Sequence, residues 1–166
     1  MMDKFAVMPH LAALAFSYAL AFPIGWNRER EERSAGLRTF PLVALASCGF
    51  IQATEALLQN SPEGTARIIE GLITGIGFIG GGAILKQGTS VQGTATAASL
   101  WVTGAIGAAV GLGSYDVAVA LALVTIVTLW WFSPTRQKTI TEGENGHRNS
   151  HANHPGRGNE ERSQTR

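Results

Sequence analysis

Two carboxylates lie at the margins of apolar stretches, where they could bind a cation. Glu55 comes near the end of the second stretch and Glu70 near the start of the third, with Glu63 and Asp116 in the flanking segments. Hard cations such as Mg²⁺ prefer carboxylate oxygens, so Glu55 and Glu70 suggest a cation mouth. The favoured interpretation is that acids near helix ends are stabilised by the helix dipole and by solvent. Arg67 is also spaced to pair with Glu70.

The sequence has no other pattern that indicates catalysis. Its one cysteine, Cys48, permits neither an internal disulfide nor a thiolate metal cluster, and we expect it to pack as a small apolar residue. A Ser-His mechanism would have to use His10, the one histidine near the apolar stretches. The residues from Gly75 to Gly80 spell G-x-G-x-x-G but lack the preceding strand and the later acid of a dinucleotide site. We therefore predict no enzymatic activity, no bound metal and no cofactor.

Five apolar stretches dominate the first 132 residues. Each approaches the ~20 residues that a helix needs to cross a bilayer. They cover residues 7–24, 40–58, 68–85, 95–112 and 117–132. Charged residues make up only 15% of the chain, and the net charge of +1 argues against nucleic acid as a partner. We predict an all-α, polytopic membrane bundle of five transmembrane helices in residues 1–132, embedded in the lipid bilayer, and a disordered polar tail in residues 133–166.

The distribution of Lys and Arg predicts how these helices are oriented. Alternate loops place 11 of the 13 cations on one side, and only Lys4 and Arg67 on the other. By the positive-inside rule the first side is cytoplasmic, so the N-terminus lies outside and the C-terminus is cytoplasmic. The four tryptophans also fall toward the cytoplasmic boundary. Because the cations follow the first stretch rather than precede it, a cleaved secretory signal is disfavoured.

Glycines mark the third and fourth stretches. Six of the 18 residues from 68 to 85 are glycine, a composition that would destabilise an isolated helix in water. In a bilayer, glycines four residues apart let two helices approach closely. The spaced residues are Gly71 with Gly75, Gly77 with Gly81, and Gly104, Gly107 and Gly111. We expect the third and fourth helices to pack as a tight pair at the centre of the bundle.

Polar side chains within and between the stretches have structural explanations. Thr96, Ser99 and Thr103 form a hydroxyl stripe, which we expect to bond to a neighbouring helix or to its own backbone. Arg and Glu alternate from residue 28 to 33, which suits a short solvated helix with internal ion pairs. Arg38 stands at the start of the second stretch, where it could reach a lipid phosphate or the carbonyls of a neighbouring helix end.

These segments together resemble the MgtC/SapB family of bacterial inner-membrane proteins. The matching residues are Asn27, Arg28, Glu29, Gly36, Leu37, Arg38 and Thr39, then residues 75–85, then residues 93–101 with Thr96 and Trp101. No single piece is decisive, but their order and spacing are specific, and the resemblance covers residues 11–130.

The resemblance implies a multi-pass protein of the bacterial inner membrane, linked to magnesium homeostasis and stress adaptation. Many members carry a soluble domain after the last helix, so we expect this chain to correspond to the membrane domain alone. Members look like modulators of other membrane machinery, such as ATP synthase or a cation pump. We therefore expect a non-enzymatic protein that packs its glycine faces against a membrane-protein partner, with a homo-oligomer as a further arrangement. The alternative is a small cation channel or transporter with Glu55 and Glu70 at its outer mouth.

Overall fold

The computed structural model of the chain describes residues 7–31, 35–58, 61–87 and 89–132. These residues form five helices and one hairpin: α1 Val7–Arg30, α2 Thr39–Leu58, α3 Pro62–Gly82, β1 Leu85–Gln87, β2 Ser90–Gln92, α4 Thr94–Gly111 and α5 Tyr115–Trp131. The helical character predicted from the sequence is confirmed. The tail expected in residues 133–166 lies outside the described residues.

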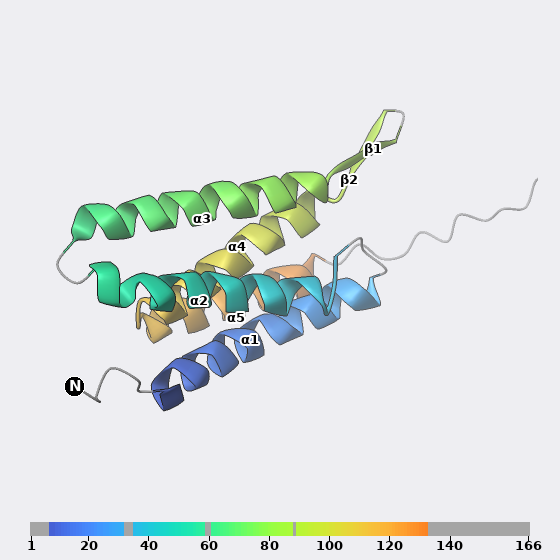
Figure 1. Ribbon diagram of the computed structural model, residues 1–166. Helices are drawn as coiled ribbons and strands as arrows, with labels where there is room; N and C mark the ends of the chain where they lie inside the picture. The colour runs from blue at the N-terminus through green and yellow to red at the C-terminus, as the bar shows by residue number, and fades with distance from the viewer. Residues whose placement is uncertain (1–6, 32–34, 59–60, 88, 133–166) are drawn as a thin grey trace, which may run out of the picture. The chain divides into compact units, whose positions relative to one another are not determined.

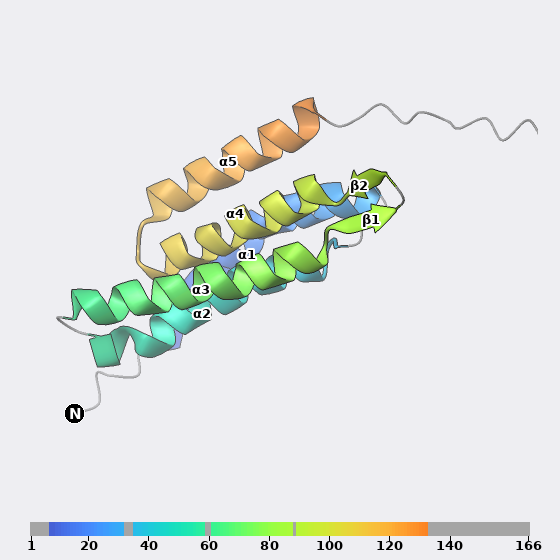
Figure 2. The ribbon, with the colours of Figure 1, turned by 90° about the horizontal axis from the view of Figure 1, so that it is seen from above.

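The helices alternate in direction, so that the end of α1, the start of α2, the hairpin and the end of α5 lie at one end of the bundle (Figure 1). Helix α4 lies at the centre, because it contacts each of the other four helices. Helix α3 lies at an edge, against α4 and α2, and α5 lies on the other side of α4 (Figure 2). The prediction of a central pair is therefore correct for α4 and wrong for α3.

Two helices differ in extent from the sequence-based prediction. Helix α1 continues six residues further, to Arg30, because its polar end is partly covered by the bundle. Helix α3 begins at Pro62, where the Ser61 hydroxyl accepts a hydrogen bond from Gly64 N at 3.2 Å. Serine before the first turn and proline within it are the residues that helix starts favour. The residues from 62 to 67 thus extend α3 beyond its apolar stretch.

A short antiparallel hairpin joins α3 to α4, although no strand was predicted. It pairs Leu85 with Gln92 and Lys86 with Val91, and it projects beyond the helix ends (Figure 1). Strands of three residues are too short to give an alternating sequence pattern. The turn into α4 requires glycine, because Gly93 has a φ of +87° and a Cβ there would collide with the carbonyl of Ala83.

The glycines of α4 pack inside the bundle. A Cβ on Gly107 would collide with Ala44 of α2, 2.8 Å from its Cα and carbonyl carbon. One on Gly111 would lie 3.0 Å from the carbonyl oxygen of Cys48, also on α2, and one on Gly104 would collide with Ile76 of α3. The closest backbone approach of α4 is therefore to α2.

Two helices, α1 and α4, are long and apolar enough to cross a membrane by length and composition, and α5 is a shorter apolar helix. Apolar residues also fill the interface between the helices, where Ile24, Phe40, Cys48, Leu100 and Ile106 are fully buried. Cys48 packs as a small apolar residue, as expected.

We predict that Gly107→Ala lowers the free energy of unfolding by about 1–3 kcal/mol, because the added methyl group separates α2 from α4. The control is Gly77→Ala, which changes a glycine of α3 with nothing within 4 Å of its Cβ position. This variant should leave stability unchanged or slightly raised, since alanine favours the helix. Unfolding in detergent micelles, followed by circular dichroism, measures the stability of both variants. If Gly107→Ala were as stable as Gly77→Ala, the close packing of Gly107 against α2 would not matter for stability.

Candidate functional site

The junction of α1 and α2 brings together residues that lie apart in the sequence. Glu29 accepts a hydrogen bond at Oε2 from the backbone N–H of Leu37, at 3.1 Å. Gly36 lies against the side chain of Glu29, which leaves no room for a Cβ. A Cβ on Gly25 would lie 3.2 Å from the carbonyl oxygen of Gly36. Close packing at Gly25 and Gly36 therefore brings the start of α2 against the end of α1.

Arg28 is buried at this junction rather than solvated. Its side chain is only 4% exposed, and its guanidinium forms an ion pair with Glu31 at 3.2 Å. The prediction of a short solvated helix is wrong for Arg28, because α1 extends to Arg30 and this residue faces the bundle. The preceding Asn27 has a buried Oδ1 that accepts no hydrogen bond among the described residues. The ion pair of Arg28 therefore lies at the end of α1, and Glu29 makes the contact with the residues before α2.

Most glycines of α3 face open space. A Cβ on Gly71, Gly75, Gly77 or Gly81 would meet nothing within 4 Å, whereas one on Gly80 would lie 3.3 Å from the carbonyl oxygen of Ala97. The prediction that the four spaced glycines pack onto α4 is therefore wrong. Gly80 makes that contact instead.

The exposed glycines of α3 lie on two different faces. Glu70, Thr74, Gly77 and Gly81 are exposed and recur at helical spacing, so we call them the outer stripe. Phe78 flanks this stripe and is 85% exposed. Gly71 and Gly75 instead line a cavity between α3 and α2.

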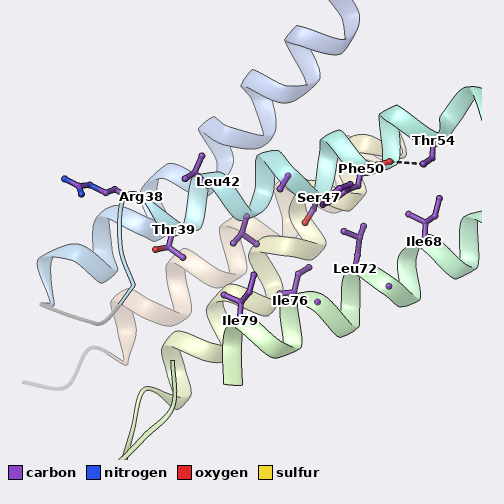
Figure 3. Close-up of a pocket in the computed structure, with 14 residues that line it drawn as sticks. Arg38, Thr39, Leu42, Ser47, Phe50, Thr54, Ile68, Leu72, Ile76 and Ile79 are labelled. Carbon is purple, nitrogen blue, oxygen red and sulfur yellow. Dashed lines mark hydrogen bonds between the residues drawn. The ribbon is translucent and has the colours of Figure 1, made fainter. Parts of the chain in front are cut away.

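This cavity, the α2–α3 groove, has a volume of about 760 Å³ (Figure 3). Its walls are mainly aliphatic and aromatic, and its lining includes Leu42, Val43, Phe50, Ile68, Leu72, Ile76 and Ile79. Arg38 and Thr39 lie at one end and Thr54 toward the other. The groove was not predicted, although a signal was present: Gly71 and Gly75 share a helix face with bulky residues at Ile68, Leu72 and Ile79.

The four acids considered for a cation mouth, Glu55, Glu63, Glu70 and Asp116, are exposed. Neither Glu55 nor Glu70 lines the groove. Within the described ranges there is no group of three or more His, Cys, Asp or Glu residues that could hold a metal ion, and Arg67 forms no ion pair with Glu70. The cation mouth at Glu55 and Glu70 stays a prediction.

The hydroxyl stripe of α4 is buried and bonds to its own helix. Ser99 donates to the carbonyl oxygen of Ala95 at 2.7 Å, and Thr103 donates to that of Ser99 at 2.8 Å. Thr96 is also buried. Ser99 and Thr103 thus bond to the backbone of their own helix, which was one of the two expected arrangements. Trp101, the other family-motif residue of α4, is half exposed and lines a smaller cavity between α3, α4 and α5.

Comparison with known proteins identifies the family. The MgtC family model matches residues 14–138. "Protein MgtC" of Salmonella typhimurium is 35% identical over 126 residues, which are 76% of this chain and 53% of the relative. "Protein MgtC" of Brucella abortus is 37% identical over 123 residues, covering 74% of this chain and 50% of the relative.

A third relative, "Protein SrpB" of Synechococcus elongatus, is 36% identical over 121 residues, covering 66% of each chain. This chain spans about half the length of the MgtC relatives. No solved structure matches. Because the family model covers most of α1 and all of α2 to α5, this chain belongs to the MgtC family and is an MgtC-type membrane protein.

Proposed function

We propose that this protein lies in the bacterial inner membrane, with all five helices crossing the bilayer and the N-terminus outside. In this proposal it catalyses no reaction. It modulates another membrane complex, such as ATP synthase or a cation pump, by packing the outer stripe of α3 against a helix of that complex. The setting is magnesium homeostasis or adaptation to stress, as the family resemblance implies.

The helix lengths support five crossings. At 1.5 Å per residue, the 20 residues of α2 span about 30 Å, the thickness of the hydrocarbon core. The part of α3 inside its apolar stretch, residues 68–82, spans about 22 Å. The 17 residues of α5 lie at the lower limit of a crossing helix. Helices that alternate in direction, as these do, suit a chain that crosses back and forth (Figure 1).

The charges and aromatic residues support the orientation. Arg28, Arg30, Arg38 and Lys86 all belong to elements that meet at one end of the bundle. The four tryptophans are exposed and lie in the end turns of α1 and α5 and the second turn of α4. Interfacial tryptophan and cytoplasmic cations favour assigning this end to the cytoplasmic side.

The outer stripe is the observation that carries the partner proposal. Small residues at i and i+4 let two helix backbones approach, and this contact replaces the hydrophobic drive that lipid removes. Gly77 and Gly81 have this spacing and no contact within the bundle. The glycines of α4 cannot serve the same purpose, because α2 and α3 already cover them. We therefore place the partner-binding surface on α3 alone, whereas the sequence suggested glycine faces on both α3 and α4.

We predict that Gly77→Leu and Gly81→Leu abolish co-purification of the partner after crosslinking in native membranes, because a leucine side chain keeps the partner backbone away. Gly75→Leu is the matched control, since it lies on the same helix but in the α2–α3 groove. It should retain the partner. Unchanged co-purification with both outer-stripe variants would reject the proposal. If only a second copy of this chain were recovered, the outer stripe would be the contact of a homo-oligomer instead.

We predict that proteoliposomes of the purified chain show no Mg²⁺ flux above that of protein-free liposomes, because Glu55 and Glu70 are exposed and neither lines the α2–α3 groove. A Mg²⁺-sensitive dye inside the vesicles measures the flux. Flux that is present and falls when Glu55→Gln and Glu70→Gln are combined would overturn this proposal in favour of a cation channel.

A further inference from the structure

The α2–α3 groove combines an apolar wall with a cation at one end. Leu42, Phe50 and Ile79 on its walls are each about half exposed, so the groove opens to the side of the bundle. The hydroxyl of Thr54 donates to the carbonyl oxygens of Phe50 and Ile51, at 2.8 and 3.0 Å (Figure 3). This hydroxyl is therefore already paired within α2. Among the residues that line the groove, Arg38 carries the one charge.

Arg38 lies at the end of the bundle that we propose to face the cytoplasm. Its side chain extends outward from the start of α2, away from the other labelled residues that line the groove (Figure 3). It forms no ion pair among the described residues. Glu29 is the acid on the adjoining element, and one of its oxygens is already engaged by the N–H of Leu37. The backbone N–H groups of Thr39 and Phe40 bond to Gly36, so side chains rather than the helix end would hold an anion.

The length and the charge of the groove favour a lipid as its occupant. The lining from Thr39 to Thr54 runs about 22 Å along α2, which exceeds the ~15 Å of hydrocarbon in one leaflet, so the groove is long enough for an acyl chain. Its volume of about 760 Å³ is in the range of small-molecule sites, and the one charge among the described residues that line it is a cation at one end.

We infer that the α2–α3 groove binds one anionic phospholipid, whose acyl chain lies along α2 and α3 and whose phosphate is held by Arg38. The planar guanidinium can donate two parallel hydrogen bonds to a phosphate, and the hydroxyl of Thr39 adds a donor at the same end. A net negative headgroup is favoured over a zwitterionic one because, among the described residues that line the groove, its end carries a cation and no acid. This inference rests on the membrane location proposed above but not on the partner.

The test uses the full chain in nanodiscs of phosphatidylethanolamine with phosphatidylglycerol, released for native mass spectrometry. The unmodified chain should retain one phosphatidylglycerol in preference to phosphatidylethanolamine. Arg38→Gln should reduce this preference at least about tenfold, since it removes a charge-assisted hydrogen bond. Arg30→Gln is the matched control, because Arg30 is exposed at the same end of the bundle but lies outside the groove. It should leave the preference unchanged.

A second pair of variants tests the acyl-chain site. Gly75→Leu places a side chain in the groove and should reduce retention of both lipids at least about tenfold, whereas Gly77→Leu, on the outer stripe, should not. Equal retention by these two variants, or equal loss of preference in Arg38→Gln and Arg30→Gln, would overturn the inference. Because Gly77→Leu is expected to lose the partner and keep the lipid, failure of the partner proposal would leave the lipid result intact.

Discussion

The contact between the backbones of α2 and α4 at Gly107 is the constraint on which the rest of the bundle depends. Lipid is as apolar as a leucine side chain, so membrane helices associate through close packing rather than through the hydrophobic effect. Dispersion falls steeply with separation, and a gap of even 1 Å loses much of it. Gly104, Gly107 and Gly111 remove side chains where α2 and α3 approach, and α4 thereby contacts all four neighbours.

Polar residues at the end of α1 hold the start of α2 close to it at the α1–α2 junction. The bond from Leu37 to Glu29 ties the residues just before α2 to α1, whereas the ion pair of Arg28 with Glu31 lies at the end of α1. Arg38 follows one residue after Leu37, so the same bond from Leu37 places the backbone of Arg38 at the end of the groove. Glu29 and Leu37, which touch no ligand, thus help to place the backbone of Arg38. Arg38 is the residue that binds the lipid phosphate in our inference.

Much of the fold could be predicted from the sequence, because apolar length determines where helices form. All five predicted helices exist, and their displaced ends have physical causes: the first turn of α3 is capped by Ser61, and the last turns of α1 are polar but partly covered. Glycine spacing correctly indicated close-packing faces on α4. It could not indicate the neighbour, because spacing determines the face of a helix, whereas tertiary packing determines what lies against it. The groove depends on two helices at once and was missed for that reason.

The six glycines of α3 are the feature that the bundle itself explains least. Of these, Gly80 alone has a neighbour within 4 Å of its Cβ position in the part of the chain that the structure describes. Each helical glycine costs about 1 kcal/mol relative to alanine in water, so a helix with five uncompensated glycines would be poorly stabilised on its own. In our proposals, the compensation comes from contacts outside this bundle. Gly71 and Gly75 open toward the groove, whereas Gly77 and Gly81 open on the outer stripe, so lipid and protein would each stabilise a separate face of the same helix.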